Sequence, residues 1–194
     1  LEFIPEDASR ESLLDDVQEM EQMVTEILET ARLKSEYGQL NLQKTDLVKL
    51  IRDICITFEG QIPGIRFENV PETFQTFVDT EQIETVLKNL LDNALKYSTV
   101  GNAPVEICLK KSDAGTLIEI QDRGPGIQDE ELDLIFEPFY RTDKSRNRKT
   151  GGYGLGLSLC KTIIEAHGGT IDVQSNTGKG TMFSLHLPKS TSTI

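Results

Sequence analysis

Hydrophobic residues along the chain recur with the periods of helices and of strands, and a clear helical run lies between residues 79 and 97. The apolar positions of this run form the stripe Ile83, Val86, Leu87, Leu90, Leu91 and Ala94. Such a stripe is typical of a helix that packs on a sheet. Asp79 precedes the run and Gln82 follows three residues later, which predicts a helix N-cap at Asp79.

Residues 1–38 predict one long helix, because they contain a single proline, Pro5, and no glycine before Gly38. Alternating spacings of four and three residues form the seam of a helix that packs on other helices: Leu13, Val17, Met20, Val24, Ile27 and Ala31. This seam is widened by Leu14, Met23, Leu28 and Leu33. A helix with so wide an apolar face requires a partner. We expect dimerisation; docking on the chain's own globular domain is the alternative.

From residue 40 the pattern changes to short strands and shorter helices. Strands are predicted near residues 40–44, 65–70 and 76–78, and a helix that begins at Thr45 and Asp46 carries the stripe Leu47, Leu50, Ile51, Ile54 and Phe58. Two hairpins, with a helix over 158–166 between them, are predicted from residues 105–110 with 116–121 and 170–174 with 181–187. This order predicts an α+β fold, a two-layer α/β sandwich. The domains expected are a long helix over 1–38, a globular domain over 40–188 and a flexible tail over 189–194.

Composition narrows the class of protein. The chain of 194 residues is 37% apolar and 27% charged, as in a globular protein with one substantial core. No apolar run reaches the roughly 18 residues of a membrane span and no secretory signal opens the chain, so we expect a cytoplasmic protein. Cys55, Cys108 and Cys160 are too scattered for a disulfide framework or a zinc site. A net charge of −12 argues against nucleic-acid binding, which depends on phosphate contacts.

The helix over 79–97 also carries a polar face. An ideal helix turns roughly 100° per residue, so four polar residues lie on one side of it, next to the apolar stripe: Asn89, Asn93, Lys96 and Tyr97. Carboxamide oxygens suit a hard cation such as Mg²⁺, and lysine suits phosphate. This face is a candidate site for an anionic ligand and its cation; the solvated face of an ordinary amphipathic helix is the alternative.

Asp122 ends the strand predicted over 116–121, and alternation places it on the same face as Ile118 and Ile120. A carboxylate on an apolar face requires hydrogen-bond donors, and the amino group of a purine is one candidate. Gly124 and Gly126 would let a flat ring approach the backbone closely. The alternative is an aspartate that caps its own turn.

Two further segments suit a phosphate ligand. The glycine-rich residues 151–157 lead into a predicted helix and would present backbone N–H groups to phosphate; a flexible hinge is the alternative. The aromatic residues Phe136, Phe139 and Tyr140 precede a basic segment, which contains Arg141, Lys144, Arg146, Arg148 and Lys149. These predict a cationic lid over a triphosphate, with a solvated loop as the alternative.

Together, these motifs resemble the ATP-binding domain of bacterial sensor histidine kinases, within the wider fold shared with gyrase, Hsp90 and MutL. Residues 89–97 resemble the N box, 122–126 the G1 box, 136–139 the F box and 152–157 the G2 box, and residues 177–183 match the last glycine turn and strand. The resemblance covers about residues 40–188, in the family's order and spacing. It implies the Bergerat sandwich, a mixed sheet covered on one face by helices. Residues 1–38 resemble the second helix of the dimerisation and phosphotransfer domain.

The resemblance implies roles for the matching residues. Asn93, helped by Asn89, is expected to hold Mg²⁺, and Lys96 is expected to meet phosphate. Asp122 is expected to bind the adenine amino group, with Thr181 beside the base. The other residues expected around ATP are Tyr97, Gly124, Gly126, Ile127, Phe136, Phe139, Arg141, Lys144, Gly152, Tyr153, Gly154, Leu155, Gly156 and Leu157. Tyr153 departs from the small polar residue often found at its position.

The function implied is transfer of the γ-phosphoryl group of ATP to a histidine on a separate dimerisation helix, in two-component signalling. The partners implied are that helix, the receiver domain of a response regulator, and a second copy of the intact protein. Nothing in the chain matches a motif such as His-Glu-Leu-Arg-Thr-Pro. His167 is expected to cap a helix end and His186 to point away from an apolar face, so we expect a catalytic fragment without autophosphorylation.

Two other functions are alternatives. One is a hydrolytic ATPase of the gyrase or Hsp90 type; those enzymes keep a glutamate where this chain has Asn89, which is a poor general base. The other is a non-catalytic nucleotide sensor or interaction module that binds through the helix over residues 1–38.

Overall fold

The computed structural model describes residues 6–35, 39–98, 101, 103–111, 115–142 and 153–189. The helices are α1 (Glu6–Lys34), α2 (Leu47–Thr57), α3 (Thr80–Tyr97) and α4 (Gly156–Ala166). The strands are β1 (Leu42–Asp46), β2 (Ile65–Glu68), β3 (Gln75–Asp79), β4 (Val105–Lys111), β5 (Gly115–Gln121), β6 (Thr170–Asn176) and β7 (Gly180–Pro188). Two short 3₁₀ helices, η1 (Asp129–Glu131) and η2 (Leu134–Phe136), lie between β5 and α4.

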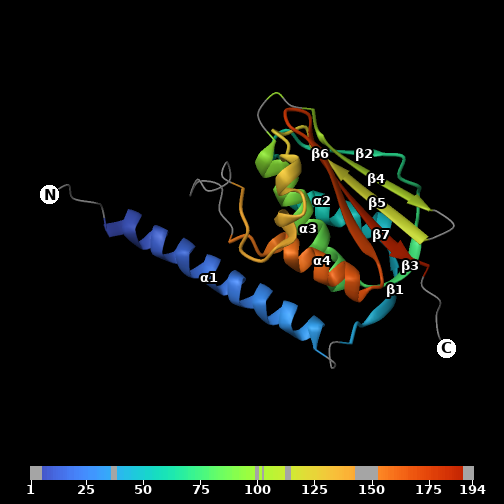
Figure 1. Cartoon of the computed structure of the whole chain (residues 1–194), viewed down its shortest axis with the longest axis horizontal. Coiled ribbons are helices and arrows are strands. Elements are labelled where there is room, and N and C mark those ends of the chain that lie inside the picture. Colours follow the sequence, from blue (N-terminus) through green and yellow to red (C-terminus); the bar gives the residue numbers. More distant parts are fainter. Residues whose placement is uncertain are drawn as a thin grey trace.

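A five-stranded mixed sheet carries the fold, in the strand order β2-β4-β5-β7-β6. Strand β2 pairs parallel to β4, and every other neighbouring pair in this sheet is antiparallel. Helices α2, α3 and α4 cover one face of the sheet, and α1 lies on the far side of this helical layer (Figure 1). The prediction of a mixed sheet with helices on one face is confirmed, as are both hairpins.

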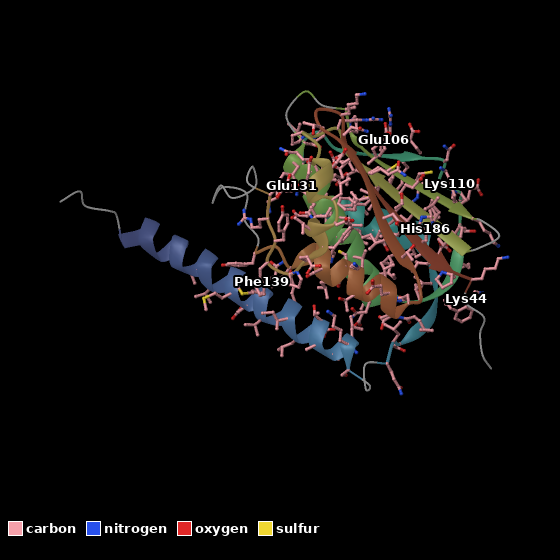
Figure 2. The ribbon with its side chains drawn as sticks, viewed as in Figure 1. Lys44, Glu106, Lys110, Glu131, Phe139 and His186 are labelled. Carbon is pink, nitrogen blue, oxygen red and sulfur yellow. The ribbon has the colours of Figure 1, made fainter. Side chains whose placement is uncertain are left out.

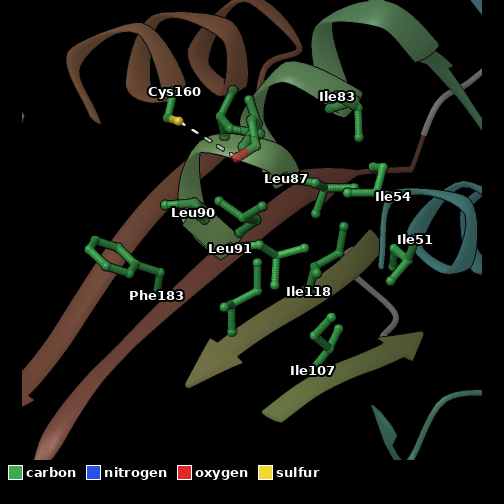
Figure 3. Packing of buried hydrophobic residues seen from close by; sticks show 14 of the residues in the cluster. Ile51, Ile54, Ile83, Leu87, Leu90, Leu91, Ile107, Ile118, Cys160 and Phe183 are labelled. Atoms are coloured by element: carbon green, nitrogen blue, oxygen red, sulfur yellow. Dashed lines mark hydrogen bonds between the residues drawn. The ribbon is translucent and has the colours of Figure 1, made fainter. Parts of the chain in front are cut away.

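The core lies between the sheet and α2, α3 and α4. All six residues of the apolar stripe predicted on α3 are buried. They meet the inward residues of β4, β5 and β7, where Ile107 pairs with Ile120 and Ile118 with Leu185 (Figure 3). The opposite face of the sheet is polar and carries Glu106, Lys110 and His186 (Figure 2). This alternation explains why helices cover one face only.

Strand β1 departs from its predicted pattern. It begins at Leu42, and Leu42 is 51% exposed although alternation suggested an inward residue there. The strand pairs only with β3, in a separate antiparallel two-stranded sheet, so the main core does not set its alternation. Leu40, before the strand, packs partly buried against the core.

Helix α1 has two distinct faces. Leu33 is buried, and Met23, Glu26 and Thr30 are half-buried on the side that packs against α4. The predicted seam is exposed at Val17, Met20, Val24, Ile27 and Ala31, while the side chain of Leu13 lies outside the described part. The two rows are offset by one residue, about 100° around the helix. Docking on the chain's own domain therefore occupies one face of α1 and leaves the seam uncovered.

Some predicted segments lie outside the described residues. These are residues 1–5 and 36–38 of the stretch predicted as one helix, and residues 190–194 of the predicted tail. None of the helices in the described ranges is both long enough and apolar enough to cross a lipid bilayer.

The buried Asp79 joins three parts of the chain. Its carboxylate caps α3 by accepting the Gln82 N–H at 3.3 Å, and it also accepts the Asn41 N–H at 2.9 Å. The Asp79 N–H donates to Nε2 of His167 at 3.1 Å. Since Nε2 accepts, the proton of the neutral ring is on Nδ1, 2.8 Å from the Ile163 carbonyl oxygen at the end of α4. His167 is the C-cap residue of α4, and its backbone N–H also donates to carbonyl oxygens of the last turn, so its predicted capping role is confirmed. Burial lowers the pKa of the His167 ring.

Candidate functional site

The polar face of α3 opens into a cavity of about 440 Å³. Asn89, Asn93, Lys96 and Tyr97 all line it, as the helical spacing predicted. The Nδ2 of Asn89 donates to the Thr85 carbonyl oxygen at 3.1 Å. No residue in the described part of the chain forms a hydrogen bond with the Asn93 carboxamide, which leaves its oxygen available to a ligand. The Nζ of Lys96 lies 3.9 Å from an Asp92 carboxylate oxygen.

Asp122 lies directly after β5 and is buried in the wall of the cavity. Its Oδ1 accepts the Gly124 N–H at 2.7 Å and the Thr181 N–H at 3.2 Å. Burial raises the pKa of Asp122, and these two hydrogen bonds act against that rise. Oδ2 accepts no hydrogen bond from any described residue. The turn-capping interpretation is therefore confirmed for Oδ1, while Oδ2 is available for the predicted contact with a purine.

The loop after Asp122 is held against the β6–β7 turn. The Ile127 N–H donates to Ser175 Oγ at 2.8 Å, and the Gly178 N–H donates to the Pro125 carbonyl oxygen at 2.7 Å. Ser175 Oγ also lies 3.0 Å from Thr181 Oγ1. These contacts fix the part of the cavity wall formed by Gly126, Ile127 and Thr181.

The N-terminus of α4 meets α3 at the cavity. Gly154, Gly156 and Leu157 line the cavity, and no described side chain caps the first turn of α4. Oδ1 of Asn89 packs against Gly156, where a Cβ would lie 2.5 Å from that oxygen. A larger residue at position 156 would therefore displace the Asn89 carboxamide from its place in the cavity. Backbone N–H groups at such a helix end attract anions.

The segment between β5 and α4 supplies a further wall. Glu131 and Tyr140 line the cavity, and the Tyr140 hydroxyl donates to Glu131 Oε1 at 3.3 Å. Arg141, Thr142 and Tyr153 also line it. Figure 2 shows Glu131 and Phe139 on the side of the helical layer, away from the outer face of the sheet.

Several candidate residues do not line the cavity. Phe136 packs edge-on against Phe183, with ring centroids 6.4 Å apart, and Phe139 is 61% exposed. Gly124 donates its N–H to Asp122, and Leu155 is the N-cap residue that precedes α4. Lys144 and Gly152, with most of the basic loop, lie outside the described residues.

The cavity contains residues that sequence reasoning missed. Helix α1 contributes Gln22, Met23 and Glu26. Other lining residues not expected from the sequence are Asp92, Ala94, Pro125, Gln128, Glu131, Ile135, Tyr140, Thr142 and Phe183. For Asp92 and Ala94 the helical spacing of α3 was an available signal, since Asp92 lies three residues after Asn89 and Ala94 lies three residues before Tyr97.

The charged residues that line the cavity affect which ions and ligands it can bind. Its described residues carry the carboxylates Glu26, Asp92, Asp122 and Glu131 and the cations Lys96 and Arg141. Within the described ranges no group of three His, Cys, Asp or Glu residues is arranged to hold a metal. The carboxamide oxygen of Asn93, together with oxygens of a bound ligand, could hold a cation in the cavity. That donor set fits Mg²⁺, which is commonly bound through few protein ligands together with substrate phosphates.

Comparison with known protein families identifies the family of the domain that contains this cavity. The family model described as "Histidine kinase-, DNA gyrase B-, and HSP90-like ATPase" matches residues 78–191, more than half of the chain. The chain belongs to this family. The matched region of this ATPase-family domain includes Asn89, Asn93, Asp122 and the N-terminus of α4, but not α1.

Individual relatives agree with this placement. The sensor protein SrrB of Staphylococcus aureus is 35% identical over 190 residues, which cover 94% of this chain and 32% of SrrB. The chain thus spans about a third of the length of that relative. Acinetobacter baumannii histidine kinase AdeS superposes with a TM-score of 0.79 at 26% identity, over 97% of this chain and 88% of the AdeS chain. Full-length ShkA in complex with AMPPNP gives 0.77 at 25% identity, over 99% of this chain and 41% of ShkA. The chain is homologous to the ATP-binding catalytic part of sensor kinases.

Proposed function

We propose that this domain binds Mg²⁺-ATP and transfers its γ-phosphoryl group to a histidine on a dimerisation helix, as the catalytic part of a sensor histidine kinase. The observation that carries the proposal is the convergence of three elements on one cavity. These are the carboxamide face of α3, the Asp122 carboxyl beyond β5, and the uncapped N-terminus of α4. Each suits a different part of ATP: the cation, the base and the phosphates.

Each group of cavity residues has a separate role in binding ATP. Asp122 accepts the adenine amino group through Oδ2, with Thr181 beside the base. Asn93, with Asn89, holds Mg²⁺, which supplies neutralisation of phosphate charge. Lys96 and the backbone of α4 from Gly156 orient the phosphates, and positioning with charge neutralisation accounts for most phosphoryl-transfer catalysis.

A water-activating ATPase is the less favoured function. Such chemistry requires a general base near the phosphates, and the carboxamide of Asn89 is not one. Its Nδ2 donates to the Thr85 carbonyl oxygen, and its Oδ1 lies beside Gly156 at the start of α4, where it accepts no proton from a water nucleophile. Transfer to an acceptor histidine needs no activated water.

The exposed seam of α1 suits a second helix. The seam residues Val17, Met20, Val24 and Ile27 are each at least 42% exposed. Three of them, Val17, Met20 and Val24, line a shallow groove along the helix together with Glu21 and Thr25. We infer that this seam packs in the dimerisation bundle of the intact protein, next to the helix that carries the acceptor histidine. The receiver domain of a response regulator would then take the phosphoryl group from that histidine. The domain limits proposed are α1 with its flanking residues for the bundle and residues 40–188 for catalysis.

Calorimetric titration with a non-hydrolysable ATP analogue tests the binding part of the proposal. We expect binding that strengthens with Mg²⁺ and that loses this Mg²⁺ dependence in Asn93→Ala. Asn41→Ala is the matched control, because that exposed carboxamide does not line the cavity. Magnesium dependence unchanged in Asn93→Ala would remove Asn93 from the metal site.

Phosphotransfer is tested separately. The purified chain incubated with labelled ATP should carry little acid-labile phosphate, whereas a dimerisation domain added in trans should become labelled on histidine. Stoichiometric labelling of the chain alone would contradict the absence of an acceptor. Tight ATP binding without transfer to any acceptor domain would favour a non-catalytic nucleotide sensor.

A further inference from the structure

Helix α1 forms one wall of the nucleotide cavity. Gln22, Met23 and Glu26 line it, together with residues of α3 and of the β5–α4 segment. They precede the region that the family model matches, so the cavity is completed by an element outside the ATPase domain proper. Figure 1 shows α1 passing beside α4, on the side of the helical layer away from the sheet.

The C-terminal half of α1 is anchored to the domain. Leu33 is buried in the core, and Nε2 of Gln82 in α3 donates to Glu29 at 3.3 Å. Glu26 lies about one turn before Glu29 and about two turns before Leu33, on the docked face of the helix. Glu26 lines the same cavity as Gly156 and Leu157 of α4, the helix against which α1 packs. Burial raises the pKa of Cys160 in α4, and the carboxylate of Glu26 adds to that rise.

The Glu26 carboxylate is held in the cavity wall. Its Oε1 accepts a hydrogen bond from Gln22 Nε2 at 3.0 Å, and both residues line the cavity. Glu26 is half-buried, and burial raises the pKa of its carboxyl above the ordinary value. The other lining carboxylates belong to the ATPase domain itself. Glu26 is the carboxylate, among the described lining residues, that enters or leaves the cavity with α1.

We propose that α1 in its docked position weakens nucleotide binding through Glu26, so that docking of α1 and occupancy by ATP oppose each other. The inference rests on the proposed function, since it requires the cavity to take ATP. A carboxylate repels a polyphosphate more strongly as the ligand charge grows. By linkage, ATP displaces α1 from the wall to the same extent that docked α1 disfavours ATP.

Ligands of graded charge test this inference in the full chain. Titrations of a non-hydrolysable ATP analogue, ADP and adenosine are compared in the wild type and in Glu26→Gln, which keeps the side-chain volume. We expect the variant to bind the ATP analogue about five- to twentyfold tighter, ADP with a smaller gain, and adenosine unchanged. Glu21→Gln is the matched control, because Glu21 lies on the exposed seam and not in this cavity. It should leave all three affinities within about twofold of the wild type.

Three results would overturn the inference. An equal gain for all three ligands would mean that the variant repacks α1. Unchanged affinities would mean that Glu26 does not oppose the phosphates. Weaker binding of the Mg²⁺-bound analogue would make Glu26 a ligand of the cation. In each case nucleotide binding by the wild type keeps the proposed function standing, whereas absence of binding in every variant overturns both.

Discussion

Replacing Asp122 by asparagine should separate ligand binding from folding. Oδ1 accepts two backbone N–H groups, from Gly124 at 2.7 Å and from Thr181 at 3.2 Å. The carbonyl oxygen of asparagine can accept both, so the turn should persist. Oδ2, which we assign to the adenine amino group, is replaced by an NH₂ that donates and cannot accept. One charge-assisted hydrogen bond to the base is therefore lost.

The expected magnitudes follow from these contacts. A hydrogen bond to a charged group contributes about 1.5–3 kcal/mol, which corresponds to a Kd weaker by about 10- to 150-fold. The free energy of unfolding should not fall with the affinity. Because burial raises the folded-state pKa of Asp122, its contribution to stability falls as the pH rises through that value. At neutral pH the charged carboxyl opposes folding, and the neutral asparagine removes that opposition. We expect the free energy of unfolding to be unchanged or slightly higher.

Calorimetric titration with the ATP analogue and urea denaturation, on the same preparations, measure the two effects. Asp172→Asn is the control, because Asp172 is an exposed carboxylate next to His186 on the outer face of the sheet. Wild-type affinity in a folded Asp122→Asn would refute the assignment of Oδ2 to the base. A large loss of stability would refute the claim that asparagine keeps both backbone hydrogen bonds.

Two further predictions concern stability. Gly126 has φ of 69°, and a Cβ there would lie 2.2 Å from the Asn176 carbonyl oxygen; Gly126→Ala should therefore lower the free energy of unfolding by about 2 kcal/mol or more, and an unchanged urea midpoint would contradict this. Because burial lowers the folded-state pKa of His167, the unfolded chain takes up the proton first. The stability due to His167 is thus complete above its ordinary pKa of 6.5 and is lost as the pH falls below it. His167→Gln should show a smaller loss of stability than the wild type between pH 7.5 and about pH 5.5, and equal losses would argue against the Asp79 contact.

The polar face of α3 was predictable because it depends on local geometry alone. Once residues 79–97 form a helix, the spacing of Asn89, Asn93 and Lys96 fixes their common side. Asp122 was predictable only in part. Its donor Thr181 is 59 residues away, so the sequence offered two interpretations without showing that each applies to a different oxygen of the carboxyl group.

The contribution of α1 to the cavity could not be predicted. Its heptad pattern identifies the seam that contains Val17 and Val24, but the polar Gln22 and Glu26 carry no periodic signal that points to a cavity. Which face of α1 meets the domain depends on where the chain turns between α1 and β1. Glu131 and Tyr140 were missed for a similar reason, since they lie in a segment with neither helical nor strand periodicity.

The base end of the cavity is built on the interior of the sheet. The Asp122 N–H donates to the Thr181 carbonyl oxygen at 2.9 Å, where β5 and β7 run side by side with β4 and β6 outside them. Amide hydrogens in such central strands exchange with solvent only when the whole domain opens. The wall formed by α1 is a single helix that packs on the outside of α4. The two sides of one cavity therefore have different lifetimes: the side at Asp122, which we assign to the base, persists as long as the fold, and the side lined by α1 can rearrange in a protein that never unfolds.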